Sequence, residues 1–443
     1  MIGGDAAGMS AASTAKKLRG DALEVVALER GDWTSYSACG IPYWIAGDIP
    51  DVHDLVARTA EEHGDSGIDV RLRTEAVAID MAAGHVKTST GESFGFDQLM
   101  IATGAEPVRP PLPGIEAEGI LGIQTLGDGE KLLAQLQGPR APRSAVVVGG
   151  GYIGVEMAEA CVRRGLTTTL VDIAAQPMRT LDPELGAQVA DAMRGMGIDV
   201  RTGVGVQGFL SGADGAVRAV VTDSGELPAD VVVLALGVRP RSALAREAGL
   251  PVGTSGGLRT SADMRCDGYE SIWAAGDVVE SWDRLRARWV HVPLGTHANK
   301  QGRTAGLGIA GKRARFLGVL GTAVTKVCDL EIARTGLSET DAAAEGMDVV
   351  AATIQSTTRA GYFPGATTMT VKMVADRRTR RVLGAQIVGR EGAATRIDTC
   401  AMALWNPTTV DELVLTDLSY APPFSSVWDP VQVAARAVAS ALD

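Results

Sequence analysis

One cysteine stands in a setting that favours redox chemistry. Cys39 lies in the segment SYSACGIPYWIAG, with Gly40, Ile41 and Pro42 directly after it. If a helix begins here, the thiol sits at its N-terminus, where the dipole and free N–H groups stabilise a thiolate and lower its pKa. Because a thiolate is the nucleophile that attacks a disulfide sulfur, we predict that Cys39 is a redox-active thiol.

The elements around Cys39 contain a glycine turn of the dinucleotide-binding type. The segment GGDAAGMSAASTAKKLRG precedes the strand-like DALEVVALERG. Gly3 and Gly8 fit the fingerprint GxGxxG, while Asp5 occupies its middle position. Glu29 closes the unit about 20 residues further on, where an acidic residue grips a ribose hydroxyl. The pattern predicts a βαβ unit for a dinucleotide.

A second unit matches the fingerprint fully. Gly149, Gly151 and Gly154 follow the apolar run SAVVV, and Asp172 ends the next strand. The first glycine allows the tight turn, the second lets the backbone approach a pyrophosphate, and the third lets helix and strand pack closely. The pyrophosphate would lie at the helix N-terminus, where the dipole favours anions. Two units predict two dinucleotide sites.

Composition bounds the classes of protein that this chain can be. It has 443 residues, 46% apolar and 21% charged, with a formal net charge of −11, as expected for a globular protein of two or three domains. The acidic charge argues against nucleic-acid binding, and no apolar run is long enough for a membrane span. The five cysteines contain no CxxC pair, and no basic, apolar leader is visible, so we expect a reducing cytoplasm.

Two further observations concern metals and the start of the chain. The five histidines form no cluster with metal-ligand spacing, so no metal site is predicted. Met1 and Ile2 lead directly into the turn at Gly3, so if that turn follows a strand, we expect most of the strand to be missing. A different start site or further N-terminal residues would explain this.

The rest of the chain predicts an α/β fold with a distinct C-terminal part. The segment MIATGAEPVRPPLPG reads as a strand with a Pro-rich crossover, and VVVLALGVRP ends in the same way. From about residue 318, four strand patterns (TAVTKVCDLEIARTG, DVVAATIQST, TMTVKMVAD and VLGAQIVG) precede a helix, ATRIDTCAMALW. This predicts an α+β domain with an antiparallel sheet.

Ordered motifs along nearly the whole chain resemble the FAD- and NAD(P)-linked disulfide reductases, and among them the single-cysteine coenzyme A-disulfide reductase and NADH oxidase group. They are GGDAAGMSAA, SYSACGIPYWIAG, IATGAEP, GGGYIGVEMAE, LALGVRP, AAGDV, AGYFPGA and YAPPFSSVWDP. The resemblance implies two Rossmann-like domains, for FAD (1–110 and 247–317) and NAD(P) (111–246), and an α+β dimerisation domain (318–443). It also implies a homodimer in which each C-terminal domain completes the partner's active site.

The resemblance assigns roles to specific residues. For FAD they are Gly3, Gly8, Glu29, Thr103, Gly104, Gly276 and Asp277, and for the nicotinamide nucleotide Gly149, Gly151, Tyr152, Ile153, Gly154, Glu156, Asp172 and Gly237. Tyr362 and Tyr420 would reach the partner's flavin and cysteine, where a phenol can bind a thiolate or supply a proton. Ser10, Thr14, Lys17, Ser35, Asn299, Arg303 and Trp428 would face substrate, with coenzyme A as the implied ligand.

The chain departs from the group's pattern at four positions. Dithiol members carry a second cysteine where Trp44 stands, so no internal disulfide forms and the oxidised state must be a mixed disulfide or a sulfenic acid. Trp428 replaces a lysine and Arg359 a histidine, and the loss of a cation weakens the case for coenzyme A. Ala6 replaces the histidine of peroxidases and water-forming oxidases, which argues against four-electron oxygen reduction.

These features predict an FAD-dependent NAD(P)H oxidoreductase that reduces a disulfide, persulfide or polysulfide through Cys39. Asp172 accepts from a ribose 2′-hydroxyl and repels a 2′-phosphate, which favours NADH, while nearby Arg179 keeps NADPH open. One alternative is an NADH oxidase that reduces O2 mainly to H2O2. Another is a nucleotide-sensing flavoprotein that binds a protein partner.

Overall fold

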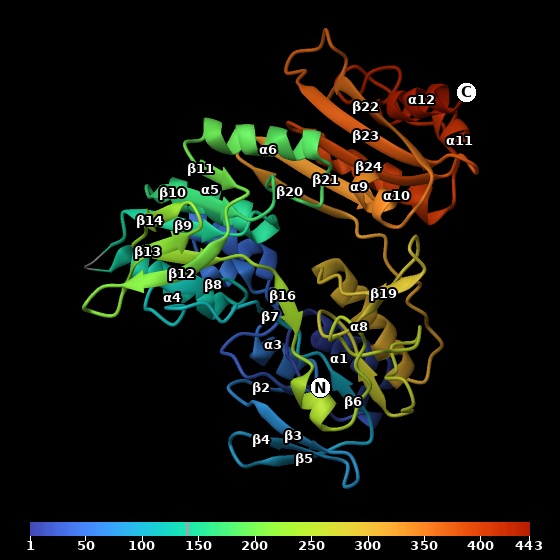
Figure 1. The fold of residues 1–443 in the computed structure, drawn as a ribbon. Helices are drawn as coiled ribbons and strands as arrows, with labels where there is room; N and C mark the ends of the chain where they lie inside the picture. The colour runs from blue at the N-terminus through green and yellow to red at the C-terminus, as the bar shows by residue number, and fades with distance from the viewer. Residues whose placement is uncertain (139–140) are drawn as a thin grey trace.

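The computed structural model describes residues 1–138 and 141–443, which form three connected parts, each built around a β-sheet (Figure 1). Among these described residues, no helix is both long and apolar enough to cross a bilayer.

The first part is a parallel sheet in the order β2, β1, Ile2, β6, β17. Its strands are β1 (Val25–Leu28), β2 (Ile68–Arg71), β6 (Leu99–Ile101) and β17 (Ile272–Ala274). Ile2 bridges both Leu28 and Ile101, so a single residue occupies the place of a strand between β1 and β6. Ile2 and β17, although far apart in the sequence, therefore belong to one sheet.

Helices and a small sheet surround this parallel sheet. They are α1 (Ala6–Arg19), α3 (Ala60–Asp65), α8 (Gly295–Ile309), the sheet β3 (Ala76–Asp80), β4 (His85–Thr88) and β5 (Ser93–Gly95), and the hairpin β18 (Ser281–Asp283) and β19 (Arg288–Val290). Helix α2 (Ile41–Ala46) packs instead on helices of the second part. Helix α8 packs closely on α1 because its glycines face α1 backbone: a Cβ at Gly302 would lie 2.2 Å from the Ala7 carbonyl oxygen. Gly306 meets the Ala11 carbonyl oxygen in the same way, at 2.5 Å.

The second part is a five-stranded parallel sheet in the order β11, β10, β9, β15, β8. The strands are β8 (Ile120–Gly122), β9 (Ser144–Val148), β10 (Thr167–Asp172), β11 (Asp199–Thr202) and β15 (Val231–Leu234). The Val-rich runs of β9 and β15 are buried almost throughout, as central strands covered on both faces must be. The accompanying elements are α4 (Leu126–Gln137), α5 (Tyr152–Arg163), α6 (Pro183–Gly195), β12 (Val206–Ser211), β13 (Val217–Thr222) and β14 (Gly225–Pro228). Helix α7 (Ala243–Glu247), which follows in the sequence, packs on β3 of the first part.

Two short antiparallel strands, β7 (Ala105–Pro107) and β16 (Val238–Pro240), join the first and second parts where the chain enters and leaves the second. Prolines end both strands, in agreement with the crossovers read from the sequence.

The third part is a five-stranded antiparallel sheet in the order β20, β21, β24, β23, β22. Its elements are β20 (Ala323–Val327), β21 (Leu330–Gly336), β22 (Val349–Thr357), β23 (Thr368–Asp376), β24 (Val382–Gly389), α9 (Glu339–Ala344), α10 (Ile397–Trp405), α11 (Val410–Val414) and α12 (Pro430–Leu442). Helices α10 and α12 pack on this sheet, and α6 of the second part runs along it as well (Figure 1). The predicted antiparallel sheet and its following helix are confirmed.

Candidate active site

The first glycine turn is closed by contacts that only glycine tolerates. Gly3 has φ +107°, and a Cβ at Gly8 would lie 2.0 Å from the Gly3 carbonyl oxygen. The first helical hydrogen bond of α1 runs from the Met9 amide to the Asp5 carbonyl, 2.9 Å. The amides of the preceding first turn therefore remain free to bind an anion.

Glu29 braces this turn from the end of β1. Its carboxylate accepts hydrogen bonds from the Gly4 amide at 2.9 Å and from the Gly31 amide at 2.7 Å. The acidic residue thus fixes the backbone of the turn, and its oxygens lie where the fingerprint places a ribose contact.

The second glycine turn repeats this construction. Gly149 has φ +105°, and a Cβ at Gly154 would lie 1.8 Å from the Gly149 carbonyl oxygen. A Cβ at Gly151 would meet nothing within 4 Å, so this side of the turn is open for a pyrophosphate. Asp172 accepts from the Gly150 amide at 2.5 Å and from the Ala174 amide at 2.7 Å. Both turns therefore fit a dinucleotide.

Three further predicted cofactor residues lie at the junction of the first two parts. The Thr103 hydroxyl donates to the Arg241 carbonyl at 2.7 Å, and the Arg241 amide donates to the Gly104 carbonyl at 2.9 Å. Gly104 and Gly237 both have positive φ, +68° and +84°. Gly104 directly precedes β7 and Gly237 directly precedes β16, so the two glycines shape the crossover between the two parts.

Gly276 and Asp277 follow β17 at the same edge as the first glycine turn. The Gly276 amide donates to the Gln301 side chain at 2.9 Å, and a Cβ at Gly276 would lie 2.9 Å from the Ala7 Cβ. Burial raises the pKa of the Asp277 carboxyl. This edge of the sheet therefore gathers the predicted FAD residues of three separate segments.

Cys39 is exposed, in the 3-10 turn Ala38–Gly40 that leads into α2. The segment before it is bound to the first glycine turn, because Thr34 Oγ and the Ser35 amide both donate to the Gly4 carbonyl. The Tyr36 amide donates to the Asp5 carboxylate at 3.2 Å. The predicted redox cysteine, Cys39, is thus positioned by the turn that would hold FAD.

The expected lowering of the Cys39 pKa is wrong for the chain alone. Although the residue is exposed, desolvation by surrounding protein atoms raises the thiol pKa, and the charges of Glu156, Asp277 and Asp5 raise it further. The 3-10 turn and the short helix α2 do not outweigh these effects.

Glu156 lies where all three parts meet. It extends from α5 and accepts a hydrogen bond from Thr325 Oγ of β20 at 2.5 Å. Burial raises the pKa of Glu156 to about 7, and burial with the charge of Glu156 raises that of Tyr43, on α2, to about 12. Thr325 could not be identified from the sequence, because its partner lies 169 positions away. Tyr152 and Ile153 precede Glu156 in α5, and burial raises the Tyr152 pKa.

Most predicted substrate residues line one face of α1 and α8. Ser10 and Asn299 meet, with Ser10 Oγ 2.8 Å from Asn299 Oδ1, and Thr14 faces Gly306. Lys17 and Arg303 are exposed and leave two cations on this face.

The Ser35 side chain contacts His63, a residue that was not predicted from the sequence to belong to the site. Ser35 Oγ lies 2.9 Å from His63 Nε2, and His63 is 2% exposed. Ser35 has φ +49°, so this tie supports a strained backbone four residues before Cys39.

The tyrosines and Trp428 form a separate exposed group on the third part. Tyr362 is 78% exposed and Tyr420 46% exposed, and their mutual hydrogen bond raises the Tyr420 pKa. Trp428 is 44% exposed and lies against Arg436, 5.3 Å from the ring centroid. Among the described residues, neither phenol hydrogen-bonds to the Cys39 segment. A single chain therefore does not bring Tyr362 and Tyr420 into contact with that segment.

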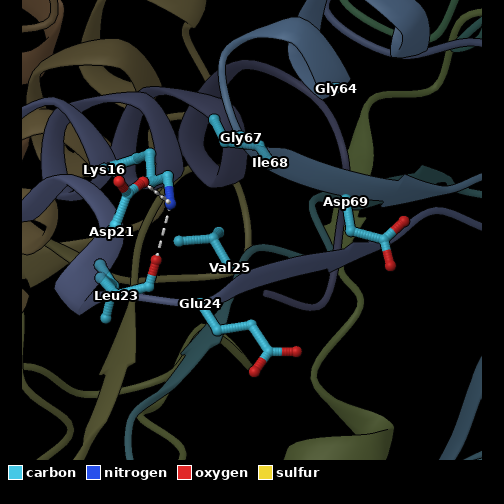
Figure 2. A pocket seen from close by; sticks show the side chains of 9 residues that line it. All are labelled: Lys16, Asp21, Leu23, Glu24, Val25, Gly64, Gly67, Ile68 and Asp69. Carbon is cyan, nitrogen blue, oxygen red and sulfur yellow. Dashed lines mark hydrogen bonds and ion pairs between the residues drawn. The ribbon is translucent and has the colours of Figure 1, made fainter.

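A broad hollow at the amino ends of β1 and β2 is not part of this site. Figure 2 shows Lys16 reaching across it to the Leu23 carbonyl, 2.9 Å, and towards Asp21, 3.9 Å. Val25 and Ile68, which begin the two strands, also line it. The glycine turn lies at the opposite, carboxyl edge of the same sheet, where nucleotides bind.

Comparison with known proteins identifies the family. Residues 1–302 match the model "Pyridine nucleotide-disulphide oxidoreductase", and residues 322–431 match the dimerisation domain of the same name. An "NAD(P)H sulfur oxidoreductase (CoA-dependent)" of Pyrococcus abyssi is 39% identical, over 98% of this chain and 97% of the relative. An "NADH oxidase" of Methanocaldococcus jannaschii is 34% identical, over 98% of this chain and 97% of the relative.

A solved structure gives the same answer. The "NAD-Dependent Persulfide Reductase from A. fulgidus" superposes with a TM-score of 0.95 at 37% identity, covering 98% of this chain and 81% of that one. The resemblance and the α/β fold class read from the sequence are confirmed. The chain belongs to the pyridine nucleotide-disulphide oxidoreductase family, whose cofactors are FAD and NADH or NADPH.

Proposed function

We propose that this chain is an FAD-dependent NAD(P)H oxidoreductase that reduces a disulfide, persulfide or polysulfide through Cys39. The observation that carries the proposal is the placement of Cys39, an exposed thiol whose segment is hydrogen-bonded to the first glycine turn. Cys161, Cys266 and Cys400 are buried, and Cys328 is half-buried. The sulfur-reducing activity named for the P. abyssi and A. fulgidus proteins supports the same reaction class.

The proposed reaction consumes one NADH, one proton and one disulfide and yields NAD⁺ and two thiols. The Cys39 thiolate attacks one sulfur, which breaks the substrate S–S bond and releases a thiolate that takes up a proton. FAD supplies the carrier through which two electrons pass from the nicotinamide to sulfur. These electrons break the mixed disulfide at Cys39, restore its thiolate and release the second thiol. With a persulfide, the products are a thiol and hydrogen sulfide.

The raised Cys39 pKa sets a requirement for this chemistry. A thiol that is neutral at pH 7 must lose its proton before attack. Glu156, buried with a pKa of about 7, is the carboxylate whose charge raises the Cys39 pKa most after burial, and it can change charge in this range. We assign Glu156 to control the charge beside Cys39, while Thr325 holds its carboxylate in place.

The match of residues 322–431 to a dimerisation domain supports a homodimer. We propose that the partner subunit's Tyr420 and the partner subunit's Tyr362 complete the site at Cys39, because both phenols are exposed and unattached to it in one chain. The exposed Trp428 would border the same interface. The proposed domain limits remain 1–110 with 247–317, 111–246 and 318–443, and a reducing cytoplasm suits five free cysteines.

Coenzyme A disulfide or a coenzyme A persulfide is the proposed substrate class. The face formed by Ser10, Thr14, Lys17, Asn299 and Arg303 offers hydroxyl and amide groups between two exposed cations, which suits a phosphorylated ligand. For the nucleotide, NADH is favoured, because a 2′-phosphate would meet the Asp172 carboxylate while Ala174 offers no cation.

The alternative function is an NADH oxidase that yields mainly H2O2, and the relative from M. jannaschii supports it. Ala6, which places a methyl group in the first glycine turn where a histidine would assist peroxide cleavage, argues against water as the product.

The experiment compares Cys39→Ser with Cys328→Ser, a half-buried cysteine outside the site, during NADH oxidation with coenzyme A disulfide or persulfide, first without oxygen and then in air. We expect Cys39→Ser to retain FAD and to be reduced by NADH, while turnover with the sulfur acceptor falls at least about 100-fold. Cys328→Ser should match the parent. Undiminished sulfur turnover in Cys39→Ser would refute the cysteine mechanism, and a high oxygen rate in both variants would favour the oxidase.

A further inference from the structure

The first glycine turn carries a charge where its counterpart carries none. Asp5 and Gly151 occupy the same middle position of the two turns. A Cβ at Gly151 would meet nothing within 4 Å, so the second turn leaves this side open. In the first turn the same side bears a carboxylate, next to the free amides that begin α1.

The Asp5 side chain does not cap its own helix. It stands at the N-cap of α1 but makes no side-chain cap hydrogen bond. Its Oδ1 instead accepts from the Tyr36 amide at 3.2 Å, in the segment that leads to Cys39. This contact accounts for the presence of an acceptor at position 5, and an uncharged amide oxygen would serve equally well.

The surroundings of Asp5 disfavour a negative charge. Burial raises the pKa of its carboxyl to about 6, against the lowering effect of hydrogen bonds from the Tyr36 and Ala6 amides. The charges of Glu29, at the end of β1, and Asp277, after β17, add to the rise. Asp5 in turn raises the pKa of Tyr36 and of Cys39, which face it from the neighbouring segment. A bound diphosphate would add negative charge to a site that already gathers three carboxylates.

We propose that Asp5 makes FAD binding proton-linked: the chain binds the FAD diphosphate more tightly when the Asp5 carboxyl is neutral than when it is ionised. The diphosphate favours the neutral form, so FAD binding takes up a proton. Affinity is highest below about pH 6, where Asp5 is neutral with or without FAD, and it falls as pH rises through that value.

The test uses the purified full-length holoenzyme and its release of FAD on dilution, followed by the fluorescence of the freed flavin, from about pH 5.5 to about pH 8. For the parent we expect the dissociation constant to rise about tenfold over this range, the effect of one pKa unit. Asp5→Asn keeps the acceptor for Tyr36 and removes the charge. It should bind FAD about tenfold more tightly at pH 8, with little dependence on pH.

Two further variants separate charge from position. Asp5→Ala removes both the charge and the acceptor for the Tyr36 amide, and should lose the pH dependence while Cys39 becomes more accessible to alkylation. Asp69→Asn, an exposed carboxylate on β2, should behave as the parent. The proposal is overturned if Asp5→Asn retains the parent's pH dependence, or if it binds FAD more weakly at pH 8. Because no sulfur substrate enters the measurement, a failure of the proposed reaction would not affect this result.

Discussion

The two nucleotide-binding units are built alike beyond their glycines. In each, an acidic residue at a strand end holds the backbone of the turn, and the residue six positions later donates its amide back to that turn. Ser35 donates to the Gly4 carbonyl at 3.2 Å, and Met178 donates to the Gly150 carbonyl at 2.7 Å. Both donors have positive φ, +49° and +53°. The loop after the acid therefore follows one path in both units.

The two loops differ in the residue that stands four positions after Ser35 and after Met178. In the first unit the chain reaches Cys39, an exposed thiol, and in the second it reaches Asp182, which is 1% exposed. The Asp182 carboxylate accepts from the Glu339 and Thr340 amides and from the Gln386 side chain of the third part. One loop therefore presents a reactive group, whereas the other attaches the second part to the third.

The largest effects are expected when a glycine of either turn is replaced by alanine. Gly154→Ala places a Cβ 1.8 Å from the Gly149 carbonyl oxygen, and Gly8→Ala places one 2.0 Å from that of Gly3. Relief of such a clash costs about 3 kcal/mol, or about 100-fold in affinity. Gly154→Ala should retain FAD and lose rapid reduction by NADH, while Gly8→Ala should lose FAD.

Gly195→Ala is the control, because its Cβ would meet no atom within 4 Å and the residue ends α6 rather than standing in either glycine turn. Flavin absorbance reports FAD content, and its bleaching by NADH under nitrogen reports the second site. If Gly154→Ala lost FAD while Gly8→Ala retained FAD but was no longer reduced rapidly by NADH, the assignment of the two turns would be reversed.

The next effect tests the structural role of the second loop. Although burial alone would raise it, hydrogen bonds from the Thr340 and Glu339 amides and from Gln386 lower the pKa of Asp182 to about 2. A depressed carboxyl pKa stabilises the fold above the unfolded value near 4, and this contribution is lost as pH falls from about 4 to about 2. Asp182→Asn should lose about 2 kcal/mol of unfolding free energy at pH 7.

Asp199→Asn is the control for this loss, since the Asp199 pair with Arg201 is exposed on both sides and a surface pair contributes at most about 1 kcal/mol. Urea unfolding at pH 7 and at about pH 3 measures the difference. A fall in sulfur turnover of Asp182→Asn under conditions where it remains folded would contradict the division between a reactive and a structural loop.

A smaller effect is expected at the loop that carries Cys39 when the charge of Glu156 is removed. Glu156→Gln removes the charge that, after burial, contributes most to the raised Cys39 pKa. The variant should therefore have a lower Cys39 pKa, and the thiol should alkylate several-fold to about tenfold faster at pH 7. The pH profile of iodoacetamide labelling measures this, with Glu339→Gln on α9 as the control. An unchanged profile would remove Glu156 from control of the thiol.

The sequence predicted those features that a residue type encodes locally. Gly3, Gly8, Gly149 and Gly154 are required by positive φ or close backbone approach, so their spacing shows where each nucleotide turn lies. The strands of the third part were equally visible, because apolar runs and turns alternate there. The path of the two loops could not be predicted, because a serine or a methionine with positive φ cannot be recognised from its residue type.

Contacts between parts were also beyond prediction. Lys372 on β23 is buried among Asp182, Glu184 and Glu339, with Nζ 2.6 to 3.1 Å from their oxygens, although up to 190 positions separate them. The Cys39 pKa was misjudged for the same reason. A helix start can be read from local sequence, whereas desolvation and the charge of Glu156 arise only when distant segments meet.

The smallest expected effect tests a side-chain contact that the first loop has and the second lacks. Ser35 Oγ contacts His63 Nε2 at 2.9 Å, whereas Met178 has no side-chain hydrogen bond of this kind. His63→Phe keeps a buried ring and removes the partner, so Ser35 is freed to rotate. Burial lowers the His63 pKa, so the parent ring is neutral at pH 7 and the change removes a hydrogen bond rather than a charge.

If Ser35 contacts the substrate and His63 orients it, the KM for coenzyme A disulfide should rise about fivefold in His63→Phe, because one neutral hydrogen bond contributes about 1 kcal/mol. The kcat should remain unchanged, since Cys39 keeps its backbone ties through Thr34 and Tyr36. Ser37→Ala, an exposed residue in the same segment, should leave both constants at the parent values. A fall in kcat with no change in KM would show instead that His63 supports the cysteine itself, and would extend the reactive loop to α3.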